Sequence, residues 1–183
     1  MKYIILLSFI CFSFNSFSQL NKDQWLIGGN ASFSYVQYGD VRFTSLQLAP
    51  SSGYLIADKF AGGIRMNFER TTHYYVQKYR STDAIIFPFL RYYFLPKVRK
   101  VNIFADASYG FGWGNANFFG VQRKYKYTSS NFAFMAGPAI FLNEHTSLEL
   151  TIAYSYTNRG KIDSIPTNTL QFGVGFQIHL GKH

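Results

Sequence analysis

Cysteine and acidic residues are scarce in this chain of 183 residues. The sequence has one cysteine, and nine aspartates and glutamates stand against eighteen lysines and arginines. One cysteine cannot form an intramolecular disulfide, so the class of small secreted domains held together by disulfides is excluded. A domain of this size without disulfides must be stabilised by burial of apolar surface or by lipid.

Long apolar runs are also absent from most of the chain. No stretch beyond the first eighteen residues approaches the roughly 18 apolar residues of a membrane-spanning helix. The start of the chain differs: an apolar run over residues 4–14 follows a lysine, and small residues occupy positions −3 and −1 before Gln19. These features predict a secretory signal peptide over residues 1–18, which holds the only cysteine, and one mature domain over residues 19–183.

The mature sequence alternates between apolar and polar residues. In the segment 101–114, VNIFADASYGFGWG, every odd position is apolar and every even position except Phe104 is polar or small, with Asp106 near the middle. A period of two predicts a β-strand, because successive side chains of a strand point to opposite sides. The same pattern predicts eight strands and no helix, over residues 25–38, 44–55, 60–70, 84–94, 101–114, 131–142, 147–156 and 168–180.

The predicted connections alternate in length. Those after the second, fourth and sixth strands are short, whereas those after the third, fifth and seventh are eleven to sixteen residues long and cover 71–83, 115–130 and 157–167. Short turns at one rim and long loops at the other are typical of outer-membrane β-barrels. An even number of strands then places both termini at the periplasmic rim.

Five charged residues in the middle of predicted strands all fall on the side opposite the apolar stripe. Buried charges must pair, and the interior of an eight-stranded barrel is just wide enough for side chains to fill. We therefore predict a membrane barrel rather than a soluble β-sandwich, with these residues as a charge network in its lumen. A salt-bridged plug is the favoured interpretation, and a proton- or ion-conducting filter is the alternative. The residues are Arg65, Glu69, Arg91, Asp106 and Glu149.

Four segments carry a resemblance to a known family: SFSQ at 16–19, PSSGYL at 50–55, FPFLRYYF at 87–94 and LQFGVGFQIHL at 170–180. With these segments the chain resembles the small eight-stranded outer-membrane β-barrels of Gram-negative bacteria, the porin-like outer-membrane protein A, X and W type. The resemblance implies an all-β, antiparallel, up-and-down transmembrane barrel in the bacterial outer membrane. It also implies insertion by the barrel-assembly machinery.

The net charge of +9 usually suggests nucleic-acid binding. In an exported chain whose cations lie mainly in turns and loops, anionic lipid headgroups fit better, and we expect no nucleic-acid partner. External loop cations are expected to contact lipopolysaccharide or a protein partner, although a simple solvated basic rim explains them equally well. These cations are Lys78, Arg80, Arg123, Lys124, Lys126, Arg159 and Lys161.

The resemblance also includes an enzymatic class, because some barrels of this size modify lipid A. His145, Ser147 and Glu149 are the residue types of a nucleophilic triad. However, His145 falls in a predicted periplasmic turn and the other two in the lumen, so we predict no catalytic residues. The four histidines are scattered and give no metal-ligand spacing, and no cofactor is expected.

Three functions follow from these patterns. The favoured one is a non-enzymatic outer-membrane barrel with a packed polar lumen and external loops that contact lipopolysaccharide or a partner. The alternatives are a narrow pore or carrier for small or apolar solutes, and a lipid A-modifying enzyme.

Overall fold

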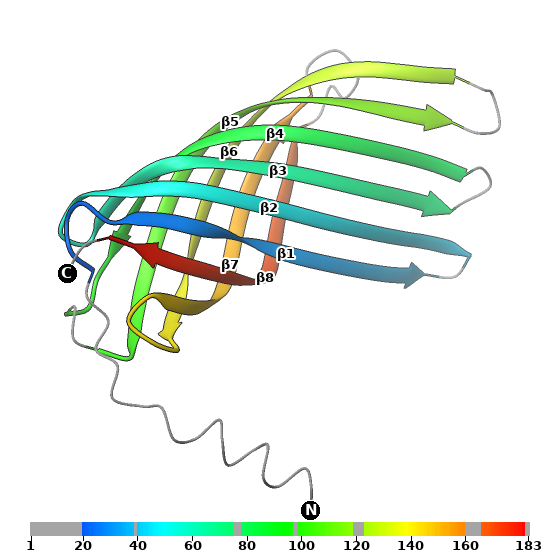
Figure 1. Ribbon diagram of the computed structural model, residues 1–183. Coiled ribbons are helices and arrows are strands. Elements are labelled where there is room, and N and C mark those ends of the chain that lie inside the picture. The colour runs from blue at the N-terminus through cyan, green and yellow to red at the C-terminus, as the bar shows by residue number, and fades with distance from the viewer. Residues whose placement is uncertain are drawn as a thin grey trace, which may run out of the picture.

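The computed structural model describes residues 20–38, 40–74, 78–96, 99–118, 123–159 and 166–181. Eight antiparallel strands form a closed barrel in which each strand pairs with its neighbours in sequence and the last pairs with the first (Figure 1). The predicted all-β barrel is therefore confirmed. No helix in the described ranges is long and apolar enough to cross a membrane. The strands are β1 (Trp25–Tyr38), β2 (Val41–Ala57), β3 (Phe60–Tyr74), β4 (Lys78–Tyr93), β5 (Val101–Phe118), β6 (Arg123–Phe141), β7 (Thr146–Asn158) and β8 (Thr167–Leu180).

Two of the three predicted long loops are wrong, because most of their residues belong to strands. Residues 71–83 and 115–130 form the outer parts of the β3–β4 and β5–β6 hairpins, which pair as far as Tyr74 with Lys78 and Phe118 with Arg123. The third, 157–167, is shorter than predicted, since β7 continues to Asn158. Figure 1 shows the long hairpins projecting from one end of the barrel, which we call the hairpin end. Both faces there are polar or aromatic, so the alternation that marks the wall is missing from the sequence.

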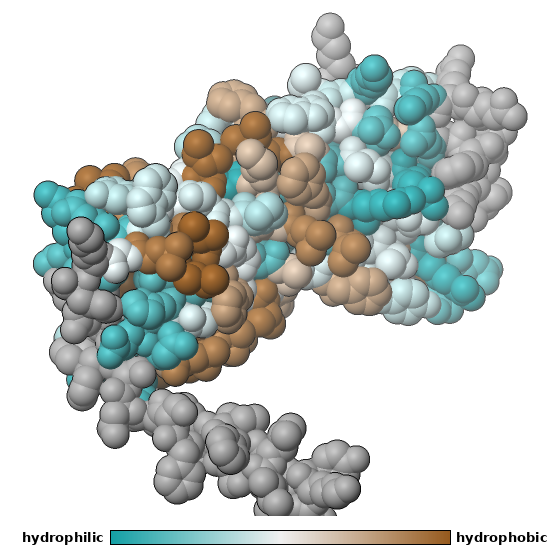
Figure 2. Space-filling model, in the orientation of Figure 1, coloured by the Kyte–Doolittle hydropathy of each residue, from teal (hydrophilic) through white to brown (hydrophobic). Residues whose placement is uncertain are grey.

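The two faces of each strand differ sharply in exposure. On β3, the outward side chain of Ile64 is 53% exposed, whereas those of Arg65 and Asn67 are 7% and 8% exposed. The outward side chains of the other strands are likewise large and apolar, and Figure 2 shows brown, hydrophobic side chains over the barrel wall and teal ones over the hairpin end. Apolar side chains on the outside and charged ones on the inside are the reverse of a water-soluble protein and are typical of a membrane barrel.

Outward-facing prolines interrupt the strand pairing without ending the strands. Pro50, Pro88 and Pro138 each have a Cα partner on the preceding strand and none on the following strand. A proline has no N–H to donate to a ladder, which accounts for the one-sided interruption. β2 accordingly continues through Pro50 to Ala57.

An apolar core fills the lumen at the end opposite the hairpins, which we call the short-turn end. The segment before β1 folds against this core: the Asp23 N–H donates to the Leu55 carbonyl oxygen at 2.9 Å, and Leu20 is completely buried. These contacts close the barrel beneath its charged residues. The core consists of Leu20, Leu26, Leu55, Ala61, Tyr93, Phe104, Met135, Ala139 and Phe141.

Candidate functional site

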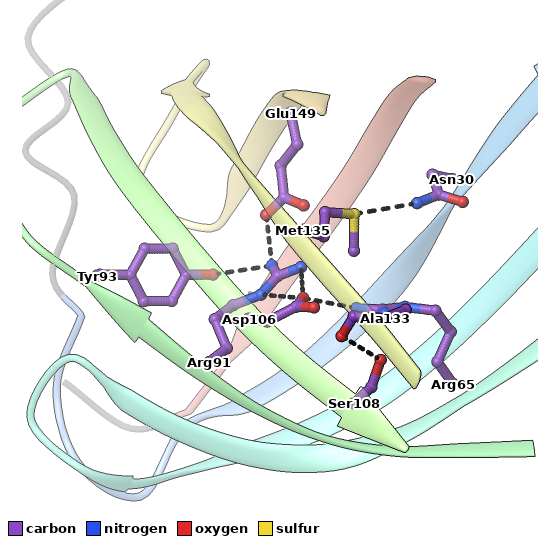
Figure 3. A network of polar contacts seen from close by, with 9 residues as sticks. All are labelled: Asn30, Arg65, Arg91, Tyr93, Asp106, Ser108, Ala133, Met135 and Glu149. Atoms are coloured by element: carbon purple, nitrogen blue, oxygen red, sulfur yellow. Dashed lines mark hydrogen bonds and ion pairs between the residues drawn. The ribbon is translucent and has the colours of Figure 1, made fainter. Parts of the chain in front are cut away.

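Four charged side chains from four strands meet inside the barrel. Asp106 on β5 accepts hydrogen bonds through Oδ2 from Arg65 Nη2 at 2.7 Å and from Arg91 Nη2 at 3.0 Å (Figure 3). Arg91 also donates through Nη1 to Glu149 Oε1 on β7, at 2.7 Å. All four residues are at most 7% exposed, and the two positive and two negative charges cancel. We call Arg65, Arg91, Asp106 and Glu149 the lumen network.

Aromatic rings hold the two guanidinium groups of the lumen network in place. The guanidinium carbon of Arg91 lies 4.1 Å from the centre of the Phe104 ring, and that of Arg65 lies 4.8 Å from the centre of the Phe89 ring. Arg91 also donates to the Tyr93 hydroxyl at 3.3 Å. A guanidinium is planar and weakly hydrated, so ring faces and carboxylates together can replace its water shell.

The fifth predicted lumen charge, Glu69, faces inward but joins no ion pair among the described residues. Its Oε1 accepts hydrogen bonds from Ser45 Oγ at 2.8 Å and Thr71 Oγ1 at 3.2 Å. It lines a cavity of about 160 Å³ that lies between the lumen network and the hairpin end. That volume holds on the order of ten water molecules, and most of the side chains around it are polar.

The mouth of this cavity holds a second polar cluster. The Tyr127 hydroxyl donates to Asp83 Oδ1 at 2.6 Å, and the guanidinium of Arg159 lies 6.0 Å from the centre of the Tyr127 ring. Arg159 was predicted to be an external contact, but the structure places it against the lumen mouth. Farther along the hairpins, His73 packs between the rings of Phe43 and Tyr79, and this burial lowers the pKa of His73 below its ordinary value of 6.5.

Three of the predicted external cations share the outer wall of the hairpins. Arg80, Lys124 and Lys126 lie on β4 and β6 rather than in loops, on the same side as the lipid-facing aromatics. Sequence analysis missed a fourth, Arg70, because it was placed at the last position of its strand. Strand register sets two rows across this wall: Arg70, Thr82, Asn115 and Lys126, then Thr72, Arg80, Asn117 and Lys124. We call Arg70, Arg80, Lys124 and Lys126 the cationic wall.

The side chains of the other predicted external cations, apart from Arg159, lie outside the described part of the structure. Lys78 begins β4 and Arg123 begins β6, but their side chains are outside the described part of the structure. Lys161 and the predicted signal peptide lie outside the described residues altogether. Cleavage before Gln19 therefore stays a prediction.

The triad-like residues are not brought together. His145 is exposed in a turn, Ser147 faces the lumen, and Glu149 is bound to Arg91. His179 lies beside Ser147, with its Nε2 3.5 Å from Ser147 Oγ, and both residues are almost fully buried in the short-turn end. Within the described ranges, no group of three potential ligands could hold a metal ion.

Comparisons with known proteins agree with this architecture. The N-terminal barrel domain of OprF from Pseudomonas aeruginosa superposes with a TM-score of 0.51 at 14% identity, covering 87% of this chain and 98% of that one. OprG from the same organism gives a TM-score of 0.54 at 12% identity, covering 90% and 99%. Neisserial surface protein A gives 0.52 at 14% identity, covering 85% and 94%. At such low identity these likenesses concern the fold alone.

No curated protein matches the sequence. Residues 4–177 match a protein family described as the outer membrane protein beta-barrel domain. The match extends over nearly the whole chain and includes all eight strands except the last residues of β8. The resemblance inferred from the sequence is confirmed: the chain belongs to the outer membrane protein beta-barrel family and lies in the bacterial outer membrane.

Proposed function

We propose that the protein is a non-enzymatic, non-conducting barrel whose cationic wall binds the phosphate groups of lipopolysaccharide. The observation that carries this proposal is the register of β3 to β6, which gathers Arg70, Arg80, Lys124 and Lys126 on one outer surface. In outer-membrane barrels the longer extensions beyond the membrane are on the extracellular side. The hairpin end, from which the long hairpins project, therefore faces the outside of the cell. Lipopolysaccharide is the lipid on that side.

The position of the cationic wall relative to the apolar wall supports this proposal. The row immediately toward the short-turn end contains Phe68 and Trp113, whose side chains are about half exposed. An aromatic ring at that height lies at the boundary between acyl chains and headgroups. The cations one and two rows farther out therefore lie at the level of lipid phosphates.

The spacing and the local charge balance also support a phosphate ligand. Adjacent strands are about 4.8 Å apart, so the two rows cover a width of about 14 Å across four strands. Glu69 and Asp83, the carboxylates on these parts of β3 and β4, line the lumen cavity, on the opposite side of the strands from the cationic wall. Thr82 and Asn115 lie between the cations of the first row, and Asn117 lies between those of the second. These side chains can donate hydrogen bonds to sugar or phosphate oxygens.

Binding of fluorescently labelled lipopolysaccharide to the refolded barrel in detergent tests this proposal. The double variant Arg80→Gln/Lys124→Gln removes the cations of one row and is expected to bind about tenfold more weakly, because exposed ion pairs contribute up to about 1 kcal/mol each. The remaining binding should also depend less steeply on salt concentration.

The matched control is Lys22→Gln/Arg99→Gln, which removes two exposed cations from the short-turn end. It is expected to bind like the parent protein. Dephosphorylated lipopolysaccharide should bind the parent protein weakly. Its affinity should match that of intact lipopolysaccharide for the Arg80→Gln/Lys124→Gln variant. Equal binding by the two double variants would overturn the proposal and leave a solvated basic rim or a protein partner as the interpretation.

A further inference from the structure

The barrel closes along only part of its length. Between β1 and β8 the pairing runs for seven residues, from Trp25 with Leu180 to Ala31 with Val174. Beyond that point β1 continues to Tyr38 paired with β2, and β8 begins at Thr167 paired with β7. Among the described residues, the facing edges of these two strands therefore diverge toward the hairpin end (Figure 1). We call this opening the β1–β8 split.

The split begins within the apolar part of the wall. If the β1–β8 pairing continued in the same register, Phe33 would lie opposite Phe172. The two residues are not paired, and their side chains are the most exposed large apolar ones among the described residues, at 68% and 70%. Tyr35 and Leu170, the next outward residues, are also large and exposed. Backbone groups without ladder partners are tolerated at membrane depth only where they are buried in protein or line a water-filled cavity.

The lumen cavity supplies such a polar lining at this position. Ser32, Thr151, Phe172 and Gly173 line both the cavity inside the barrel and an apolar groove on its outer wall. The inner and outer surfaces thus meet at the split. The groove also includes Phe33, Leu150, Ile152 and Val174 on its lipid side.

Polar side chains bridge the split from within. Gln171 Nε2 on β8 donates to Gln47 Oε1 on β2 at 2.8 Å, across β1. Ser32 Oγ on β1 donates to the same oxygen at 3.0 Å. Neutral amides and hydroxyls therefore face the opening on the lumen side, whereas the nearest cation of the lumen network, Arg65, is already paired with Asp106.

We propose that the β1–β8 split is a lateral binding site for a single-chain amphiphile with an uncharged polar head, such as a monoacylglycerol. The acyl chain lies in the outer groove against Phe33, Ile152 and Phe172. The head passes through the split into the lumen cavity, where Gln47 and Gln171 provide hydrogen-bond donors and acceptors. The residues named as contacts for the amphiphile lie on β1, β2, β7 and β8, apart from the cationic wall, and the proposal does not depend on lipopolysaccharide binding.

A membrane-soluble reagent with a reactive head tests this site. In a Cys11→Ser background, Met135→Cys places a thiol in the lumen cavity, beside Asn30 of β1. Dodecyl maleimide in the vesicle membrane can reach this thiol through the split, and its maleimide carbon then bonds to sulfur while the thiol proton moves to the adjacent carbon. We expect it to react about tenfold faster than a charged, water-soluble maleimide, because its chain concentrates in the bilayer.

Two single-cysteine controls set the scale for this experiment. Met66→Cys faces lipid and reports the concentration of the reagent in the membrane, whereas Ala139→Cys is fully buried in the short-turn core and should not react. The proposal is overturned if Met135→Cys reacts with dodecyl maleimide as slowly as Ala139→Cys does.

Disulfide cross-linking tests two other arrangements of the split, which are full closure of the β1–β8 ladder and coverage by a second copy of the chain. A disulfide requires Cα atoms about 4.4–6.8 Å apart, so Ala31→Cys/Val174→Cys should cross-link within one chain and Phe33→Cys/Phe172→Cys should not. Efficient intramolecular cross-linking of the second pair would show that the ladder closes fully. Cross-linking between two chains would show that a second copy covers the edge, and either result would contradict the proposal.

Discussion

Replacement of Arg91 by leucine is expected to lower the free energy of unfolding by about 3–5 kcal/mol, which is the usual cost of removing one partner from a buried ion pair. Arg91 binds two carboxylates and is only 3% exposed. Its loss leaves Glu149 with no cation and Asp106 with Arg65 alone. The buried carboxylate of Glu149 then lacks the interaction that offsets its desolvation, and this accounts for the lost stability.

The double variant Arg91→Leu/Glu149→Leu separates lost charge pairing from lost volume. It keeps the bond between Arg65 and Asp106 and leaves no net charge in the lumen network. Replacing a buried pair by apolar residues is often close to neutral, so most of the lost stability should return. Urea titration in lipid vesicles, followed by heat-modifiable gel migration, measures both variants. A single variant that loses less than about 1 kcal/mol, as an exposed pair would, contradicts the account.

The parent barrel is expected to conduct no steady ion current across a planar bilayer. The lumen network and the apolar core below it occupy successive levels of an interior that eight strands make only wide enough for side chains. The double variant Tyr93→Ala/Phe104→Ala removes two fully buried rings from this obstruction. It should open a measurable current, because the space left by the two rings lets water and ions enter the short-turn core.

The matched control for the conductance measurement removes the same two ring types from the lipid side. Tyr109 and Phe111 stack edge to face on the outer wall, so Tyr109→Ala/Phe111→Ala should leave the barrel closed. Regular conductance steps in the parent protein would contradict a plugged lumen. They would favour the alternative in which the charges form an ion-conducting filter.

The barrel could be predicted from the sequence because lipid and lumen impose opposite chemistries on alternate residues. That alternation identified all eight strands and placed Arg65, Arg91, Asp106 and Glu149 on the inner face. It failed in the hairpins beyond Arg70 and Gly114, where both faces meet water: polar residues there alternate with polar or aromatic ones rather than with aliphatic ones, and these residues were assigned to loops. Arg70 was missed as a wall residue because it was placed at the last position of its predicted strand.

Features set by the closure of the barrel left no signal in the sequence. The extent of β1–β8 pairing depends on how two strands at opposite ends of the chain meet, and each strand alternates normally along its whole length. Burial of Leu20 similarly depends on the chain folding back beneath the lumen before β1 begins. Glu69 has the residue type and position of a network member, but the hydroxyl groups of Ser45 on β2 and Thr71 on its own strand bind it instead.

The central claim is that lipid surrounds the apolar face of each strand and that the charges lie inside the barrel. Spin labels on single cysteines at positions 64 to 68 of β3, in vesicles, test it most directly. Labels on the outward residues Ile64, Met66 and Phe68 should collide with oxygen dissolved in the bilayer, and labels at Arg65 and Asn67 should not. A reversed alternation, or equal contact with oxygen at all five positions, would contradict the account.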